Sequence, residues 1–114
     1  MNLHNMNLNP SPFEMIRSGR KTIELRLLDE KRQQIKVGDG IVFTNTLTKE
    51  TLSAAVVGLH KFASFDELYD NLPLLKCGYT EEDIGEANPR DMEQYYSLAE
   101  QKKYGVVGIE LIII

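Results

Sequence analysis

The alternation of apolar and polar side chains predicts five β-strands. Residues 22–27 place isoleucine and leucine on one face and threonine, glutamate and arginine on the other, which is the period of two of a half-buried strand. The same reasoning predicts strands over 41–45, 51–61 and 106–113, and a weaker one over 3–8. Both faces of 51–61 carry apolar side chains, so we expect this strand to be central in its sheet.

Helix-capping patterns predict short helices between the strands. A Ser, Thr or Asn side chain can cap the first backbone N–H groups of a helix, and an acidic residue three positions later can reach back to the cap. The first helix should stop at Gly19, and the second should run through Leu72 because a proline follows. We expect helices to start at Ser11, Ser64, Thr80, Asn88 and Ser97.

These elements predict a single α+β domain over residues 1–114. The chain has 114 residues, shows no repeat and no linker, and is long enough to bury a core without disulfides or metals. Strands of this number and length can close into a small mixed β-barrel of about five to six strands, with short helices at the periphery.

The charge is distributed unevenly along the chain. The formal net charge is −4, which argues against a protein that coats nucleic acid by bulk charge. Residues 17–36 nevertheless hold seven basic and three acidic side chains, whereas residues 64–100 hold ten acidic and two basic ones. The basic segment is either a local anion-binding site or a solvated face.

Targeting and redox features point to the cytoplasm. Residues 1–10 lack the basic start and apolar run of a signal peptide, and the longest apolar stretch, 111–114, is too short to span a membrane. The single cysteine, Cys77, cannot form an internal disulfide, which fits a reducing compartment. We therefore expect a cytoplasmic protein with no membrane partner.

Three segments resemble a known family. Residues 19–26, GRKTIELR, fit the G-x-K-x-x-E-x-R signature of the ASCH domain, whose fold is similar to that of PUA RNA-binding domains. Residues 36–43 look like the turn and strand that follow in that family, and residues 104–111 are similar to its closing strand. The three segments occur in the family's order and span essentially the whole chain. The resemblance implies a PUA-like barrel that binds RNA or a nucleotide-like ligand in a cleft beside it.

The resemblance also implies a possible enzyme. One bacterial branch hydrolyses the acetyl amide of N4-acetylcytidine with a Lys, a Thr and a Glu, and some relatives are reported as ribonucleases. Lys21 matches the lysine of that branch, whereas Glu24 stands at the position of its threonine and no residue here aligns with its glutamate. Two functions therefore stay open: a module that binds RNA, a nucleotide or a nucleoside, and a small hydrolase acting on a modified nucleoside or on RNA. A purely structural interaction domain would leave the basic signature unexplained.

The candidate site is centred on Lys21, Glu24 and Arg26. A lysine partly buried near Arg20 and Arg26 would lose its proton more readily and could act as a base or nucleophile, with Glu24 as a second catalytic group. Glu24 and Arg26 lie two apart on one strand and can pair or flank a ligand. Ligand contacts are expected from Arg20, Thr22, Arg26 and Tyr96, with Tyr95 or Tyr96 stacking on a base.

No metal site or cofactor is expected. His4 and His60 have no cysteine or acidic residue at metal-ligand spacing, and no phosphate-binding loop or nucleophile elbow occurs. Cys77 is expected to be a buried structural thiol, and Asp39, in a Gly-Asp-Gly sequence, a turn former.

Overall fold

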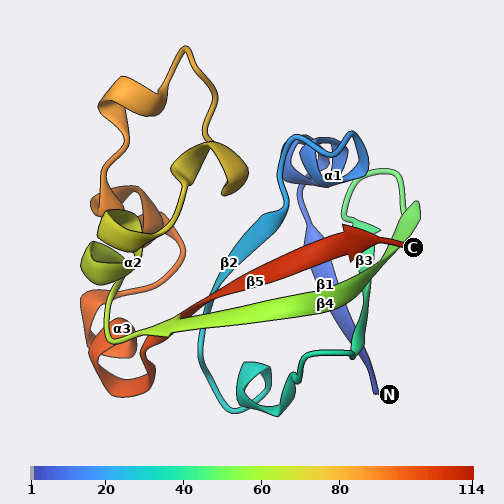
Figure 1. The fold of residues 1–114 in the computed structure, drawn as a ribbon, viewed down its shortest axis with the longest axis horizontal. Helices are drawn as coiled ribbons and strands as arrows, with labels where there is room; N and C mark the ends of the chain where they lie inside the picture. The colour runs from blue at the N-terminus through green and yellow to red at the C-terminus, as the bar shows by residue number, and fades with distance from the viewer. Residues whose placement is uncertain (1) are drawn as a thin grey trace.

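The five strands form one curled sheet in the computed structural model, which describes residues 2–114 (Figure 1). The strand order is β1-β3-β4-β5-β2; β1 is parallel to β3, and every other neighbouring pair is antiparallel. The strands are β1 (Leu3–Leu8), β2 (Ile23–Leu27), β3 (Gly40–Asn45), β4 (Thr51–Phe62) and β5 (Val106–Ile113). All five strand predictions are confirmed to within one residue at each end, and β4 is central as expected.

The sheet curls into a half-barrel whose two edge strands are β1 and β2. The α+β, PUA-like prediction is therefore confirmed. A side-chain hydrogen bond joins these two edge strands across the open side of the half-barrel: Nη2 of Arg26 in β2 donates to the carbonyl of Asn7 in β1 at 2.9 Å. Backbone pairing is thus replaced at this seam by a side chain from one strand and a carbonyl from the other.

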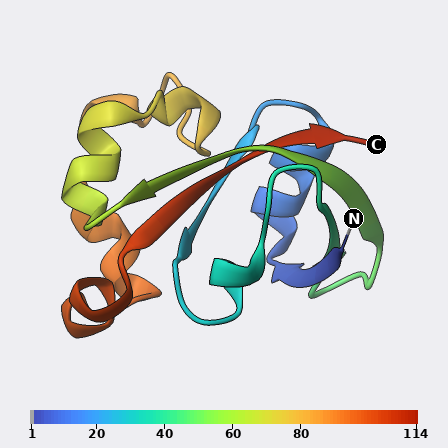
Figure 2. The same ribbon diagram turned by 60° about the horizontal axis from the view of Figure 1, so that its bottom comes forward.

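The helices are short and gather in two places (Figures 1 and 2). The helix α1 (Pro10–Arg17) packs against the barrel core through Phe13 and Ile16. The other helical elements between β4 and β5 form a lobe on the opposite side of β2. The lobe contains α2 (Phe65–Asn71), α3 (Leu98–Tyr104) and three 3-10 helices: η2 (Leu74–Lys76), η3 (Ile84–Glu86) and η4 (Pro89–Gln94); a further 3-10 helix, η1 (Arg32–Gln34), precedes β3.

Three of the predicted caps are confirmed by hydrogen bonds, and two of these begin α-helices. The Ser64 hydroxyl accepts from the Glu67 N–H at the start of α2, and Ser97 and Glu100 form a full capping box at the start of α3. The prediction that Ser11 caps the first helix is wrong. The helix begins at Pro10 with Asn9 as its N-cap, because a proline at the first helical position needs no hydrogen-bond partner.

The acidic segment after Thr80 is not the α-helix that we predicted. The Asp83 carboxylate accepts from both the backbone N–H and the hydroxyl of Thr80, at 2.6 and 3.1 Å. This local turn competes with helix formation, and only the short η3 follows it. Asn88 does form a capping box with Asp91, but the segment that it caps is the 3-10 helix η4.

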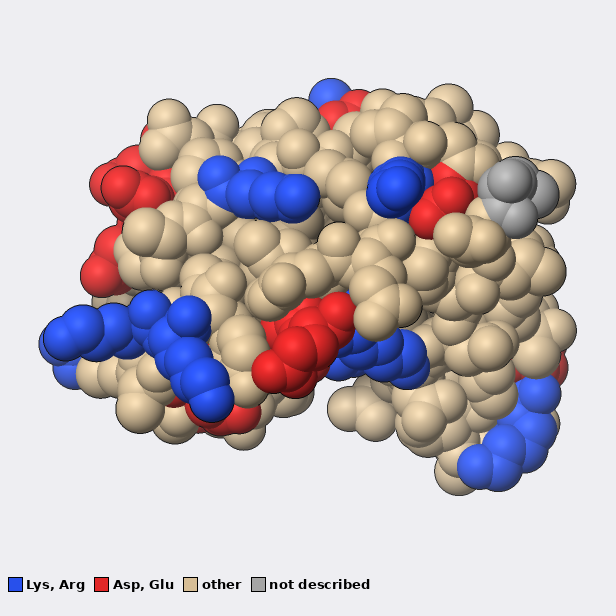
Figure 3. Space-filling view, turned by 90° about the horizontal axis from the view of Figure 1, so that it is seen from below, with Lys and Arg blue, Asp and Glu red and all other residues tan. Residues whose placement is uncertain are grey.

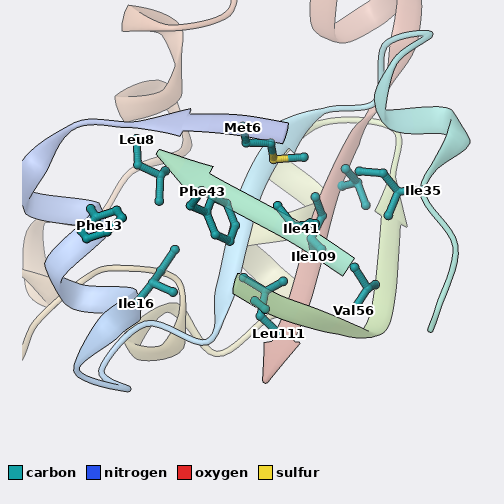
Figure 4. Close-up of a cluster of buried hydrophobic side chains, with 12 residues drawn as sticks. Met6, Leu8, Phe13, Ile16, Ile35, Ile41, Phe43, Val56, Ile109 and Leu111 are labelled. Carbon is teal, nitrogen blue, oxygen red and sulfur yellow. The ribbon is translucent and has the colours of Figure 1, made fainter. Parts of the chain in front are cut away.

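Two buried clusters lie on opposite sides of the sheet. The first fills the barrel and joins α1 to the inner faces of β1, β3, β4 and β5 (Figure 4). The second joins the β2 side chains Ile23, Leu25 and Leu27 to the lobe, mainly through Phe65 and Leu68. The apolar face of β2 thus packs on the lobe, and its polar face is left to form a site.

Candidate functional site

A cavity of about 520 Å³ opens between the half-barrel and the helical lobe. Its walls come from the end of β1, from α1, from β2, and from the lobe segments 77–79 and 91–96. Its titratable and aromatic lining residues are Lys21, Glu24, Arg26, Tyr69, Cys77, Tyr79, Asp91, Tyr95 and Tyr96. Segments far apart in the sequence therefore contribute to one concave surface.

The floor of the cavity is a carboxylate held between two cations. Glu24 Oε1 lies 2.7 Å from Lys21 Nζ, and Glu24 Oε2 accepts from Arg26 Nε, also at 2.7 Å. The side chains of Lys21, Glu24 and Arg26 are only 11, 4 and 13% exposed. The three residues, called the triad below, carry a net charge of about +1 in a largely dehydrated setting.

Glu24 and Arg26 stay ionised at neutral pH. Burial by itself would raise the pKa of Glu24, but Lys21 and Arg26 outweigh burial and hold that pKa below its usual range. Burial likewise opposes the charge of Arg26, yet Glu24 and the neighbouring Tyr96 raise its pKa. Both carboxylate oxygens are occupied, so Glu24 is fixed as an acceptor for its two cationic neighbours.

Local structure fixes the position of Lys21. Gly19 adopts a φ of +80°, which glycine tolerates, and the chain then returns so that the Lys21 N–H donates to the Met15 carbonyl of α1 at 3.0 Å. The Lys21 side chain passes over Gly78, whose φ is +113° and whose added Cβ would lie 3.4 Å from Lys21 Cδ. The lobe therefore approaches the lysine closely at a residue without a side chain.

A chain of hydroxyl hydrogen bonds forms another wall of the cavity. The Tyr69 and Tyr79 hydroxyl oxygens lie 2.6 Å apart, and Tyr79 donates to Asp91 Oδ2, also at 2.6 Å. Burial raises the pKa of Tyr79 above its usual range, and the carboxylate of Asp91 raises it further. Both tyrosines therefore keep their protons at neutral pH.

Two further tyrosines differ in how they are held. Tyr96 stacks on the buried Phe65, with ring centroids 6.1 Å apart and an interplanar angle of 19°. Tyr95 is 59% exposed and lines the cavity beside it. Tyr96 therefore packs against the core, and the ring of Tyr95 is free to contact a ligand.

The structure brings together four of the six predicted site residues. Lys21, Glu24, Arg26 and Tyr96 all line the cavity. Arg20 is exposed, donates from Nε to the Ser18 hydroxyl, and is not part of the lining. Thr22 is also outside the lining, and its backbone N–H donates to the Lys76 carbonyl. The expected crowding of Lys21 by Arg20 is absent, and the neighbour of Lys21 is a carboxylate instead.

The basic segment is largely paired with its own neighbours. Arg17 pairs with Glu14, Arg32 pairs with Asp29 at 2.9 Å, and Lys31 donates to the Asn5 carbonyl at 3.0 Å. On the face seen from below, the basic side chains lie in separate groups, some of them directly beside acidic side chains, and form no continuous basic stripe (Figure 3). A long polyanion would therefore find little continuous positive surface on this face.

The other singled-out residues have structural partners. Cys77 is buried, as predicted, and burial raises the pKa of its thiol to about 11, so it is a poor nucleophile at neutral pH. Asp39 forms the predicted turn by accepting from the Lys36 N–H, and it also accepts from Asn2 and contacts His4 Nε2 at 2.9 Å. His60 contacts Glu110 at 2.8 Å on neighbouring strands.

Sequence reasoning missed Tyr69, Tyr79 and Asp91. They are separated by 10 and 12 residues and share no motif, so no spacing rule joins them. The sequence offers only a weak indication of this part of the site, namely tyrosines that lie near a glycine in an acidic segment. Among residues 2–114, no helix is long and apolar enough to cross a membrane.

Comparisons with known proteins identify the fold. The chain is 35% identical to hypothetical protein PH0355 over 100% of both chains, with a TM-score of 0.81. It is 32% identical to protein PF0455 from Pyrococcus furiosus, covering 98% of this chain and 97% of that one, with a TM-score of 0.75. ASCH from Zymomonas mobilis shares the fold at 18% identity, with 97% and 67% coverage and a TM-score of 0.67. No curated protein matches the sequence.

The family model for the ASCH domain matches residues 6–114, which include the signature, the triad and every wall of the cavity. Members of this family are generally RNA-binding and PUA-like in fold. The chain belongs to the ASCH domain family.

Proposed function

We propose that this protein binds RNA or a nucleotide-like ligand by taking one base into the cavity. The observation that carries the proposal is the buried triad of Lys21, Glu24 and Arg26 at the floor of a tyrosine-lined cavity. The family relationship supports the same ligand class.

The size and lining of the cavity suit a nucleobase. A volume of about 520 Å³ falls within the range of about 300–1,000 Å³ typical of small-molecule sites. The exposed ring of Tyr95 offers a stacking face, and stacking on an aromatic side chain contributes about 1–3 kcal/mol per base. The Lys21 ammonium has one partner, Glu24, among residues 2–114, so its other N–H groups can donate to a base carbonyl or a phosphate.

A titration with nucleosides, nucleoside monophosphates and a short single-stranded RNA tests this proposal. Amide chemical shifts should move around the cavity, and Tyr95→Ala should weaken nucleoside binding about tenfold through loss of stacking. Arg20→Ala is the matched control for the basic segment: it should leave nucleoside binding unchanged and weaken only the longer RNA. Shifts that cluster away from the cavity, or nucleoside binding that Tyr95→Ala leaves intact, would contradict the proposal.

The second candidate function is hydrolysis of a modified nucleoside or of RNA. The observation in its favour is the short contact between Lys21 and Glu24 inside the cavity, because this lysine matches the catalytic lysine of the amidohydrolase branch. Against it, Glu24 is held ionised with both oxygens occupied, so it is poorly placed to accept a proton from water. Binding is therefore the function that the geometry supports best.

Incubation with N4-acetylcytidine and a panel of acylated nucleosides, read by mass, distinguishes the two candidates. If the protein is an amidohydrolase, Lys21→Ala abolishes turnover and Lys21→Arg fails to restore it, because a guanidinium does not release its proton at neutral pH. Turnover that survives Lys21→Ala would exclude a catalytic lysine. No turnover across the panel, together with binding, would leave the binding function alone.

A further inference from the structure

The hydrogen bonds between Tyr69, Tyr79 and Asp91 run in one direction. A carboxylate has no proton to give, and a tyrosine hydroxyl has one. Tyr79 donates that proton to Asp91 at 2.6 Å, so the 2.6 Å contact between the two hydroxyls requires Tyr69 to donate to Tyr79. The proton of Tyr69 is therefore directed along the chain and away from any ligand.

This direction turns one wall of the cavity into a set of acceptors. Tyr69, Tyr79 and Asp91 all line the cavity, and both hydroxyl protons are already committed within the chain. Toward a ligand these three residues, the acceptor wall, have only oxygen lone pairs to offer. Burial raises the pKa of Tyr69 as well, so no deprotonated hydroxyl changes this arrangement at neutral pH.

The floor of the same cavity has the opposite character. Lys21 and Arg26 have N–H donors and no acceptor, and each oxygen of Glu24 is already paired with one of them. The cavity therefore has donors on its floor and acceptors on its wall. A ligand that pairs with both must itself carry a donor and an acceptor on its edge.

We propose that the acceptor wall makes this site select bases that carry an N–H donor, with the base carbonyl or ring nitrogen facing Lys21 and Arg26. The inference rests on the proposed function and specifies its ligand class: a heterocycle with an amino group or ring N–H beside an acceptor atom. A base without the donor leaves an acceptor lone pair of the Tyr69 oxygen desolvated and without a donor, while the Tyr69 proton stays bonded to Tyr79. Such a mismatch in a buried site is disfavoured more strongly than the matched bond is favoured.

Two pairs of ribosides test this selection without adding bulk. Pyrimidin-2-one riboside is cytidine without its amino group, and purine riboside is adenosine without its amino group. All four are uncharged, so long-range electrostatics do not enter. The wild type should bind the amino member of a pair about tenfold more tightly in a calorimetric or NMR titration.

Three Tyr→Phe variants test whether the preference for the amino group comes from the acceptor wall or from the rest of the cavity. Tyr69→Phe should reduce the amino preference to about twofold or less, because it removes the acceptor. Tyr79→Phe should also reduce it, since the Tyr69 proton is then free to turn toward the ligand. Tyr95→Phe is the matched control, because its ring lines the cavity but its hydroxyl has no hydrogen-bond partner among residues 2–114; it should keep the full preference.

The possible outcomes are distinct. Equal binding of both members of each pair, or an amino preference that persists in Tyr69→Phe and Tyr79→Phe, would overturn this inference and leave the proposed function intact. No binding of any riboside, mononucleotide or RNA would overturn the proposed function, and this inference with it.

Discussion

Replacement of Glu24 by glutamine tests whether the triad is held together by charge. Glu24→Gln keeps the shape of the side chain but leaves Lys21 and Arg26 as two poorly hydrated cations with no counter-charge between them. Removing one partner of a buried ion pair destabilises a protein by about 3–5 kcal/mol. The two cations are 11 and 13% exposed, so some solvent screening remains, and we expect the lower end, about 3 kcal/mol.

Urea denaturation at pH 7 measures this change directly. In a domain of this size, about 3 kcal/mol corresponds to a fall in Tm of about 10–15 °C. The matched control is Glu110→Gln on the neighbouring strand β5: this carboxylate also pairs at 2.8 Å, with His60, but its side chain is 44% exposed. An exposed pair contributes little, so the control should change stability by no more than about 0.5–1 kcal/mol.

The effect of Glu24→Gln should depend on pH with a defined sign. The folded-state pKa of Glu24 lies below its unfolded value, so its stabilising contribution is present above about pH 4.3 and is lost as the pH falls through the folded pKa. The difference between wild type and Glu24→Gln should therefore shrink in acid. A difference at pH 7 no larger than that of the Glu110→Gln control, or one that is constant down to pH 2, would refute the electrostatic account of the triad.

Three further predictions concern packing, acid stability and RNA binding. Gly108→Ala should cost about 1–3 kcal/mol in denaturation experiments, because its Cβ would lie 2.7 Å from Leu72 Cδ1, whereas Gly85→Ala, with nothing within 4 Å, should cost far less. The pKa of Asp39 is lowered to about 2, first by its hydrogen bond to His4 and then by two backbone N–H groups, so its stabilising contribution is full above about pH 4 and is lost as the pH falls toward 2. Asp39→Asn should accordingly lose less stability than the wild type between pH 4 and pH 2; parallel losses would exclude this role. RNA binding should weaken with added salt but only shallowly, because few phosphates can be neutralised, and a steep slope would mean that the polyanion contacts more of the surface than the cavity.

Local sequence rules predicted the strands well because each strand buries a face. The alternation in 22–27 fixed which β2 side chains are apolar and which are polar, and the structure buries Ile23, Leu25 and Leu27. The same alternation placed Glu24 and Arg26 on one face, and the two side chains do pair. Periodicity could not indicate that the apolar face meets a helical lobe rather than the barrel interior, because that depends on contacts with residues about 40 positions away.

Helices in the lobe were harder to predict because side chains compete with helical hydrogen bonding. The pattern at Thr80 is that of a helix N-cap, yet the Asp83 carboxylate takes both Thr80 donors and closes a turn. Asn88 forms the capping box that its pattern predicts, but a 3-10 helix follows. A cap pattern identifies hydrogen-bond donors that need partners and does not by itself determine how many turns follow.

For the site as well, residues close together in the sequence could be predicted, whereas residues brought together from distant segments could not. The signature predicted Lys21, Glu24 and Arg26, which lie within six residues on one turn and strand. It also suggested Arg20 and Thr22, but the turn at Gly19 directs Arg20 to solvent, and the Thr22 backbone is engaged by the lobe. The opposing wall comes from α2 and from segments 77–79 and 91–96, which only the fold brings together.

The floor and the acceptor wall of the cavity differ in how much each contributes to the stability of the fold. This difference determines which substitutions can report on ligand binding alone. The triad supports the fold as well as the site, since Arg26 also bridges the barrel edges through the Asn7 carbonyl and Glu24 pairs with two nearly buried cations. Loss of binding in a triad variant therefore mixes loss of a ligand contact with loss of stability. The wall residues are separable: a Tyr→Phe substitution removes one oxygen and keeps the ring packing. Because the wall also sets the direction of the hydroxyl protons, it is the part of this site where ligand specificity can change while the fold is kept.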